Sequence, residues 1–193
     1  MEALKFREMP YERPDGEALK TSMRTLTEKL RAAGSYDAAK AVFLEKETLS
    51  KHIQTLATLA QVRHTIDTVA GRVPVIVGSG SNCTATQIEM SRRYEAMGAD
   101  ALLIIAPYYN KANAEGMYRH FMMSADAVTA PIILYNVPGR TGCKISPDVV
   151  RRLSVHPNVM AIKEASGDMS YAMKIARCVG PDFALYSGND DIT

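Results

Sequence analysis

The chain has 193 residues, which is enough for one domain with a substantial core or for two small domains. Hydrophobic residues make up 47% and charged residues 23%, an ordinary composition that argues against global disorder. Lysine and arginine (23) nearly balance aspartate and glutamate (21), and the formal charge is +2. The basic field that a nucleic acid or an anionic membrane would require is therefore absent.

Cysteine usage and apolar patterning indicate a reducing compartment. The odd number of cysteines and the lack of Cys-x-x-Cys spacing argue against a disulfide framework and a structural zinc site; they are Cys83, Cys143 and Cys178. No apolar signal segment opens the chain, and no apolar run approaches the roughly 18 residues of a membrane span. We expect a cytoplasmic protein with no membrane segment.

The histidines do not predict a metal site. His64 is followed by Asp67 on a helical segment without the His-Glu-x-x-His spacing of a zinc enzyme. His52, His120 and His156 have no evident partners in the sequence. We therefore predict that the protein binds no metal.

Residues 16–68 have a helical pattern. Asp15 lies in a Pro-Asp-Gly turn and can cap a helix that starts there. Apolar residues then recur every three or four positions, at Leu19, Met23, Leu26 and Leu30. After Gly34-Ser35 a second stripe runs to about Asp67 through Val42, Leu49, Ile53, Leu56 and Ala60. The pattern predicts two antiparallel helices with a short connection.

After Gly71, short apolar runs alternate with helical stretches. The runs of strand length are 73–77, 101–106, 131–135, 159–163 and 183–186. The helical patterns between them cover about 84–98, 113–128, 146–155 and 169–179. This alternation predicts a parallel sheet with right-handed crossovers, as in Rossmann-like folds and TIM barrels.

Polar and conformationally special residues follow every predicted strand. They occupy 78–82, 107–110, 136–142, 163–168 and 187–191. Polar residues at five successive strand ends are typical of the carboxyl face of a barrel, where every strand contributes to the site. A doubly wound sheet has a single binding crevice instead. The segment holds about five of the eight strands of a complete barrel. We predict an α/β fold, a partial (β/α)8 TIM barrel over 69–193 preceded by an α-helical hairpin over 1–68.

Lys163 is the strongest candidate for a catalytic residue. It closes an apolar strand, where burial disfavours the ammonium and favours the neutral amine that attacks a carbonyl. Taken alone, a lysine that extends from a strand end into solvent is the commoner case. Tyr135 holds the equivalent position one strand earlier, and a phenol beside an imine-forming amine can relay protons. Tyr135 could equally be an amphipathic residue that fills the barrel mouth.

Other strand-end residues have weaker interpretations. Arg140, in a Pro-Gly-Arg-Thr-Gly turn, could bind a substrate carboxylate through both guanidinium nitrogens, or it could be an ordinary exposed loop arginine. Tyr108 and Tyr109 could be core aromatics, an oligomer contact or catalytic residues. The residues themselves do not rank these alternatives.

The strand-end motifs together resemble a known family. Residues from about 69 to 193 resemble the middle of the dihydrodipicolinate synthase family, Schiff-base pyruvate aldolases that include N-acetylneuraminate lyase. The matching segments, in order, are Gly78-Ser-Gly-Ser-Asn82, Pro107-Tyr-Tyr-Asn110, Tyr135-Asn-Val-Pro-Gly-Arg-Thr-Gly142, Ile162-Lys-Glu-Ala165 and Ser187-Gly188. The resemblance implies a TIM barrel that condenses pyruvate with aspartate semialdehyde in lysine biosynthesis, without a metal or organic cofactor.

The resemblance also implies roles for individual residues. Lys163 matches the lysine that forms an imine with pyruvate, and Tyr135 matches the proton-relay tyrosine. Tyr109 matches a tyrosine lent to the relay of a neighbouring subunit, which implies a homo-oligomer. Arg140 matches the arginine that receives the carboxylate of the aldehyde, and Gly188 a backbone position of the pyruvate pocket. A final pair falls where some members bind the feedback effector lysine, namely Asn82 and Tyr108.

The chain also departs from the family pattern. The family's first two strands, with a Gly-Thr-Thr-Gly-Glu-like loop that completes the proton relay, are expected before residue 69, and no such loop occurs there. The eighth strand is not found before Thr193. Residues 1–68 instead resemble the N-terminal helical region of M3-family oligoendopeptidases, through Met9-Pro-Tyr-Glu-Arg-Pro14 and Val62-Arg-His-Thr-Ile-Asp-Thr68. That family's zinc motif is absent, so no peptidase activity is implied.

Two functions follow from these observations. The first is a pyruvate-dependent Schiff-base lyase, weak or inactive in turnover because the relay loop is missing. The second is a catalytically silent chimeric protein, built from fragments of two unrelated families that join near Thr68–Val69. Two chains could also complete each other's barrel in a dimer.

Overall fold

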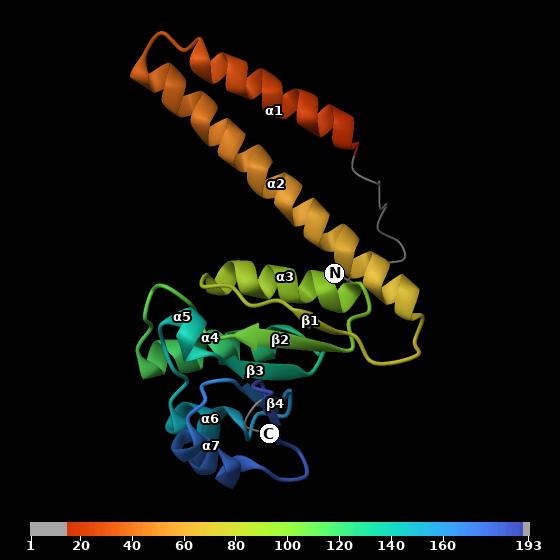
Figure 1. Ribbon diagram of the computed structural model, residues 1–193, viewed down its shortest axis with the longest axis vertical. Helices are drawn as coiled ribbons and strands as arrows, with labels where there is room; N and C mark the ends of the chain where they lie inside the picture. Colours follow the sequence, from red (N-terminus) through yellow and green to blue (C-terminus); the bar gives the residue numbers. More distant parts are fainter. Residues whose placement is uncertain (1–14, 191–193) are drawn as a thin grey trace. The chain divides into compact units, whose positions relative to one another are not determined.

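A computed structural model describes residues 15–190 (Figure 1). The chain divides into two compact units, Met1–Thr68 and Val69–Thr193, and each is described by itself. The expected Met9–Pro14 motif and residue 191, at the end of the last polar segment, lie outside the described residues. Both the helical hairpin and the five-stranded parallel sheet predicted from the sequence are confirmed.

The first unit is built from α1 (Gly16–Arg31) and α2 (Tyr36–Val69). Asp15 caps α1 as predicted, because its carboxylate accepts hydrogen bonds from the backbone N–H groups of Glu17 and Ala18. Ser35 caps α2 by accepting from Ala38 N at 3.2 Å. The apolar stripes of the two helices face each other: Leu26 and Leu49 line one shallow groove, and Leu19, Met23 and Ile53 line another.

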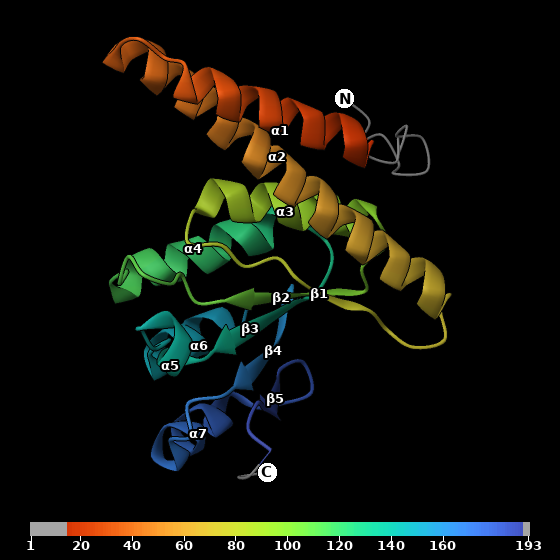
Figure 2. The same ribbon diagram turned by 45° about the horizontal axis from the view of Figure 1, so that its top comes forward.

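The second unit contains one sheet in which consecutive strands pair in parallel, in the order β1-β2-β3-β4-β5 (Figure 2). The strands are β1 (Ile76–Gly78), β2 (Ala101–Ile105), β3 (Ile132–Asn136), β4 (Val159–Glu164) and β5 (Ala184–Ser187). The crossovers contain α3 (Thr84–Ala96), α4 (Ala114–Ala127), α5 (Pro138–Thr141) with α6 (Pro147–Leu153), and α7 (Met169–Ile175) with the 3-10 turn η2 (Ala176–Cys178). This strand order, with a helix after each of the first four strands, is that of a barrel segment.

Both faces of the sheet are apolar. One face carries fully buried branched residues, namely Leu102, Ile104, Ile132, Leu134 and Ile162. The other face carries a cluster of small and branched residues, Ala101, Ile133 and Ala161, with Leu103 and Ala184 packed against it. Helices α3, α4, α6 and α7 pack against one another in chain order. Right-handed crossovers between neighbouring parallel strands place such helices on one side of the sheet.

Most element boundaries lie within one or two residues of the sequence prediction, and three local features depart further from it. The first strand begins at Ile76 rather than Val73, because Val75 N bonds to the Asp100 carboxylate at 2.6 Å instead of to the ladder. The turn around Arg140 is a one-turn helix, α5, with Pro138 at its start and Gly142 (φ 69°) at its end. The last helix becomes a 3-10 turn after Ile175.

Candidate active site

The loops that follow the first three strands meet at the carboxyl edge of the sheet. Asn110 donates from Nδ2 to the carbonyl of Asn82 at 3.1 Å, which joins the loops after β2 and β1. Tyr109 N donates to Thr141 O at 3.3 Å, which joins the loops after β2 and β3. Residues from separate strand ends are thereby gathered on one edge, as a barrel site requires.

Lys163 and Tyr135 lie side by side on this edge. They are register partners on β4 and β3, and both are half-buried. The Lys163 Nζ atom lies 4.9 Å from the centroid of the Tyr135 ring, a cation–π distance. Within residues 15–190 no hydrogen bond joins the Tyr135 hydroxyl to that amine. The structure brings the two predicted residues together, with the amine beside the ring and not against the hydroxyl.

Gly188 packs against the stem of Lys163. A Cβ atom at position 188 would lie 3.0 Å from Lys163 Cε, 2.6 Å from Ala165 Cβ and 3.1 Å from Glu164 O. The Gly188 N–H donates to Glu164 O at 2.6 Å. Only a residue without a side chain allows the end of β5 to approach the end of β4 this closely, which explains the glycine at this position.

Arg140 lies in the last turn of α5, and its side chain is exposed. Among the described residues its guanidinium makes no ion pair, and no hydrogen bond joins it to Lys163 or Tyr135. The short helix holds its backbone, because Arg140 N donates to Val137 O at 2.9 Å. The guanidinium is therefore available to an anion from solution.

The two loop tyrosines differ in conformation. Tyr109 has φ 72°, in the left-handed region that bulky residues rarely adopt, and its side chain is 89% exposed. Tyr108 is 39% exposed and has no such strain. The interpretation of Tyr109 as a core aromatic is excluded by its exposure.

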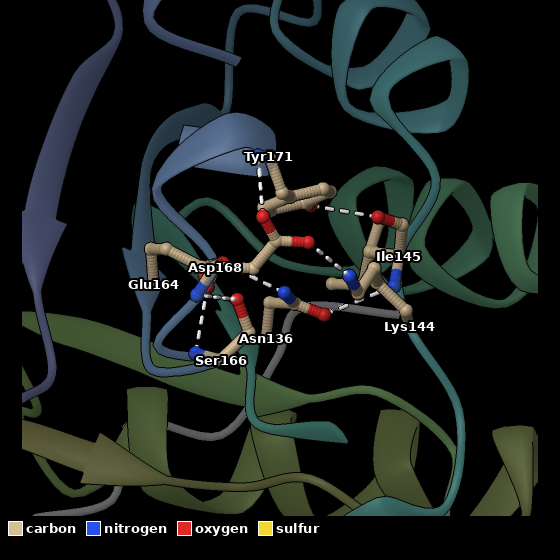
Figure 3. A network of polar contacts seen from close by, with 7 residues as sticks. All are labelled: Asn136, Lys144, Ile145, Glu164, Ser166, Asp168 and Tyr171. Atoms are coloured by element: carbon tan, nitrogen blue, oxygen red, sulfur yellow. Dashed lines mark hydrogen bonds and ion pairs between the residues drawn. The ribbon is translucent and has the colours of Figure 1, made fainter. Parts of the chain in front are cut away.

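Two features of the site were not anticipated from the sequence. Tyr186 on β5 is the register partner of Lys163 on the side opposite Tyr135, although its side chain is 55% exposed. Glu164, next to Lys163, is only 8% exposed and accepts hydrogen bonds from Asn136 and Ser166 (Figure 3). The position of Tyr186 depends on strand register, and the burial of Glu164 depends on its hydrogen-bond partners. Neither can be recognised from residue spacing alone.

A second buried polar cluster supports the loop that contains Asn82. His120 contacts Thr84 Oγ1 through Nδ1 at 2.8 Å and Gln87 Oε1 through Nε2 at 2.9 Å. Gln87 Oε1 also accepts from Ser81 N at 3.0 Å, so the oxygen is an acceptor and the Nε2 of His120 carries the proton. Burial lowers the pKa of His120. No partner of His120 was evident from the sequence, because Thr84 and Gln87 are distant from it along the chain.

His156 also has a partner that the sequence did not reveal, since its Nε2 lies 3.1 Å from Asp126 Oδ1. In the described part of the chain, no three His, Cys, Asp or Glu side chains are grouped closely enough to hold a metal ion. All three cysteines are free thiols. No helix between residues 15 and 190 combines the length and apolarity needed to cross a membrane.

Comparison with protein-family models gives two matches. The dihydrodipicolinate synthetase family matches residues 45–193, and the peptidase M3 N-terminal domain matches residues 6–69. The two matches overlap over 45–69, which lies within α2. The first match covers all five strands, and the second lies in the helical hairpin and the residues before it.

Individual relatives support the first match. The 4-hydroxy-tetrahydrodipicolinate synthase of Pseudomonas aeruginosa is 47% identical over 142 residues, which are 74% of this chain and 47% of that protein. The crystal structure of a dihydrodipicolinate synthase from Bacillus anthracis superposes with a TM-score of 0.69 at 46% identity, over 70% of this chain and 47% of that one. The crystal structure of a chloride-inhibited dihydrodipicolinate synthase from Acinetobacter baumannii, complexed with pyruvate, superposes with a TM-score of 0.68 at 40% identity. The match covers 70% of this chain and 46% of that one.

The chain spans about half the length of the relatives it matches. The shared half contains the five parallel strands and the strand-end motifs, and the solved relatives have the same fold there. The chain belongs to the dihydrodipicolinate synthetase family.

Proposed function

We propose that Lys163 forms a Schiff base with pyruvate, as the first step of a reaction of the 4-hydroxy-tetrahydrodipicolinate synthase type. The single observation that carries this proposal is the placement of the amine of Lys163, a half-buried residue, beside the Tyr135 ring, with Gly188 packed on the lysine stem. Relatives with the name of that enzyme, and one solved relative complexed with pyruvate, support the choice of substrate.

The chemistry needs only the lysine as electron sink. The neutral Nζ of Lys163 adds to the C2 carbonyl of pyruvate, and loss of water from the carbinolamine leaves a C=N bond. The protonated imine acidifies the pyruvate methyl group, and loss of a methyl proton gives an enamine. The enamine carbon then adds to the carbonyl carbon of aspartate semialdehyde, whose oxygen takes up a proton, and the imine to Lys163 is regenerated. Attack of the amino group of the condensed product on the imine carbon releases Lys163 as the free amine. No metal or organic cofactor takes part in this sequence.

Three residues would assist these steps. Tyr135 would donate and accept the protons of the carbinolamine through its hydroxyl. Arg140, exposed and without an ion pair among the described residues, would bind the carboxylate of the aldehyde. The backbone of Gly188 would line the pyruvate pocket beside the lysine stem.

Two further roles concern assembly and regulation. Tyr109 is held outward on a strained loop, and we assign it to the relay of a neighbouring subunit in a cytoplasmic homo-oligomer. Asn82 and Tyr108 lie on loops that the Asn110 side chain joins, and we assign them to an effector site for lysine. The contact between these loops supports a shared site.

Condensation should be slow in this chain. No Gly-Thr-Thr-Gly-Glu-like loop occurs among the 193 residues, and relay groups that act together lose most of their effect when one is missing. We therefore propose imine formation with slow condensation for this chain. The match of residues 6–69 to the peptidase M3 N-terminal domain favours the alternative, a silent protein that joins segments of two families near Thr68–Val69.

The test is borohydride trapping with pyruvate, read by intact mass. Borohydride delivers hydride to the C=N bond and converts the imine to a stable secondary amine. We expect one pyruvate adduct on the wild-type chain and none on Lys163→Ala, with both proteins shown to be folded by circular dichroism. Equal labelling of the two proteins, or no labelling of the folded wild type, would support the silent protein.

A further inference from the structure

The strand ends that carry Tyr135 and Lys163 present a second pair of residues on the opposite face. Asn136 and Glu164 directly follow those two residues, and successive side chains of a strand point to opposite faces. Asn136 and Glu164 are also register partners. Asn136 is fully buried and Glu164 is 8% exposed. Each reactive residue is therefore followed along its strand by one member of a buried polar pair, whose side chain lies on the opposite face of the sheet.

The pair is joined by hydrogen bonds that fix the orientation of both side chains (Figure 3). Asn136 Nδ2 donates to Glu164 Oε2 at 2.6 Å, and Asn136 Oδ1 accepts from Ile145 N at 3.0 Å. Glu164 Oε1 accepts from Ser166 N at 2.6 Å. Both glutamate oxygens face N–H donors, so this position requires two acceptors, which a carboxylate provides and an amide does not.

The backbones of the same two residues hold the neighbouring segments. Asn136 O accepts from Ala165 N at 2.9 Å, and Glu164 O accepts from Gly188 N at 2.6 Å. The ends of β3, β4 and β5 are thus joined through Asn136 and Glu164. A shift of the Glu164 side chain would act on Lys163 through the shared backbone and on Gly188 through this bond.

The network extends from Glu164 to the segment that follows Arg140. Ser166 Oγ accepts from Asp168 N at 3.1 Å, and the Asp168 carboxylate pairs with Lys144 at 2.9 Å. Tyr171 closes the ring by donating its hydroxyl to Ile145 O at 2.6 Å. Burial, with the nearby charge of Glu164, raises the pKa of Tyr171, so this hydroxyl stays a neutral donor. The chain after α5 is anchored at Ile145 by two bonds.

Stability alone does not account for a carboxylate at this position. Among residues 15–190, no lysine or arginine forms an ion pair with Glu164, so its charge is compensated only by N–H donors. Burying a carboxylate in this way costs free energy that an apolar residue of similar size would not. The buried carboxylate that carries this cost directly follows Lys163, on the opposite face of the sheet. This placement favours a role for Glu164 in positioning the reactive pair.

We infer that Glu164, together with Asn136, is a positioning residue of the Schiff-base site, which fixes the strand ends so that the Lys163 amine lies beside Tyr135. This inference rests on the proposed function. Neither residue shares the face of the sheet on which the reactive pair lies. Their effect reaches the reaction through the backbones of β3 and β4 and through Gly188.

The two side chains allow a reciprocal exchange as a test. Glu164→Gln places an N–H₂ group against a donor, and Asn136→Asp places two carboxylates against each other. The double variant Asn136→Asp/Glu164→Gln restores every bond, because the introduced aspartate accepts from Ile145 N and from the glutamine amide, while the glutamine oxygen accepts from Ser166 N. The measurement is the rate of borohydride-trapped pyruvate adduct at saturating pyruvate, so that weaker binding does not contribute.

We expect each single variant to trap pyruvate about tenfold or more slowly than the wild type, since small displacements of reacting groups are costly. The double variant should return to within about threefold of the wild-type rate. Ser124→Ala is the matched control: it removes a buried hydrogen bond between α3 and α4, which Gln87 donates, and should lower stability without slowing trapping. Single variants at the wild-type rate, or a double variant as slow as the singles, would overturn the inference.

Failure of the proposed function gives a different pattern. A folded wild type that traps no pyruvate rejects the Schiff-base function, and amide hydrogen exchange then decides the positioning role. Exchange at Ala165 N and Gly188 N should accelerate in Glu164→Gln and recover in the double variant. Unchanged exchange at both amides would overturn the positioning role independently of any chemistry.

Discussion

The amine of Lys163 lies 4.9 Å from the centre of the Tyr135 ring, and the two residues are register partners on adjacent parallel strands. Parallel pairing with this register places both side chains on the same face at the same height. The relationship therefore follows from backbone pairing and does not depend on a flexible loop. An amine held beside a phenol at a barrel mouth is suited to Schiff-base chemistry.

The first prediction concerns the Tyr135 hydroxyl. Tyr135→Phe keeps the ring beside Lys163 and removes the proton-relay group, so pyruvate trapping should slow by about 10² to 10⁴. Tyr186→Phe is the matched control, because Tyr186 flanks Lys163 on the other side and is 55% exposed. Rates are measured by quenching with borohydride at timed intervals. Equal slowing by both substitutions would contradict a specific relay at Tyr135.

The second prediction concerns the close approach at Gly188. Gly188→Ala forces a methyl group against Ala165 Cβ and Lys163 Cε, so unfolding free energy should fall by about 1–3 kcal/mol and trapping at Lys163 should slow. Gly180→Ala is the control, because a Cβ there meets nothing within 4 Å. Urea unfolding and trapping are measured on both variants. A Gly188→Ala protein as stable and as reactive as Gly180→Ala would contradict the packing argument.

The third prediction concerns pH. Burial holds the pKa of His120 below its usual value near 6.5, so below that pH the unfolded chain binds more protons than the folded one. Stability should therefore fall as the pH drops from about 6.5 toward the folded-state pKa, by at most about 1.4 kcal/mol per pH unit. Urea unfolding between pH 5 and pH 8 measures this slope.

A substitution separates His120 from the other titrating groups. His120→Gln is neutral throughout this range and should flatten the slope below pH 6.5, at the cost of a lower stability at pH 8. His52→Gln, at an exposed position on α2, should keep the wild-type slope. An unchanged slope in His120→Gln would show that the acid sensitivity arises elsewhere.

The fourth prediction concerns backbone strain at Tyr109. Asparagine tolerates the left-handed region better than tyrosine, and the side chain is 89% exposed, so little burial is lost. Tyr109→Asn should raise the unfolding free energy of the single chain, measured at a protein concentration too low for assembly, by about 0.5–1 kcal/mol. Tyr108→Asn, without a positive φ, should not stabilise. A loss of stability in Tyr109→Asn would mean that the tyrosine is held by contacts that outweigh its strain.

Periodicity and strand-end chemistry predicted much of this fold. Helical spacing located the hairpin, and the alternation of apolar runs with helical segments located all five strands, because both patterns are set by local backbone geometry. The first strand was placed too early, since a side chain distant in sequence, Asp100, takes the hydrogen bond of Val75. This hydrogen bond forms only in the folded structure, so the apolar pattern of residues 73–77 does not indicate it.

The site was predictable in part for the same reason. Lys163 and Tyr135 could be placed together because equivalent strand-end positions on neighbouring parallel strands are adjacent. The buried pair of Asn136 and Glu164 could not, because polar residues after a strand look like an ordinary loop until their partners are known. The partners of His120 lie on α3, more than thirty residues away.

The proposed function requires that one lysine, Lys163, is the carbonyl-reactive group of this chain. The most direct measurement is peptide mapping of the borohydride-reduced pyruvate adduct on the folded wild-type protein. We expect the label on the peptide that contains Lys163, with Lys144 and Lys174 unmodified. A label spread over several lysines, or its absence from the Lys163 peptide, would show that Lys163 is not the specific imine-forming residue.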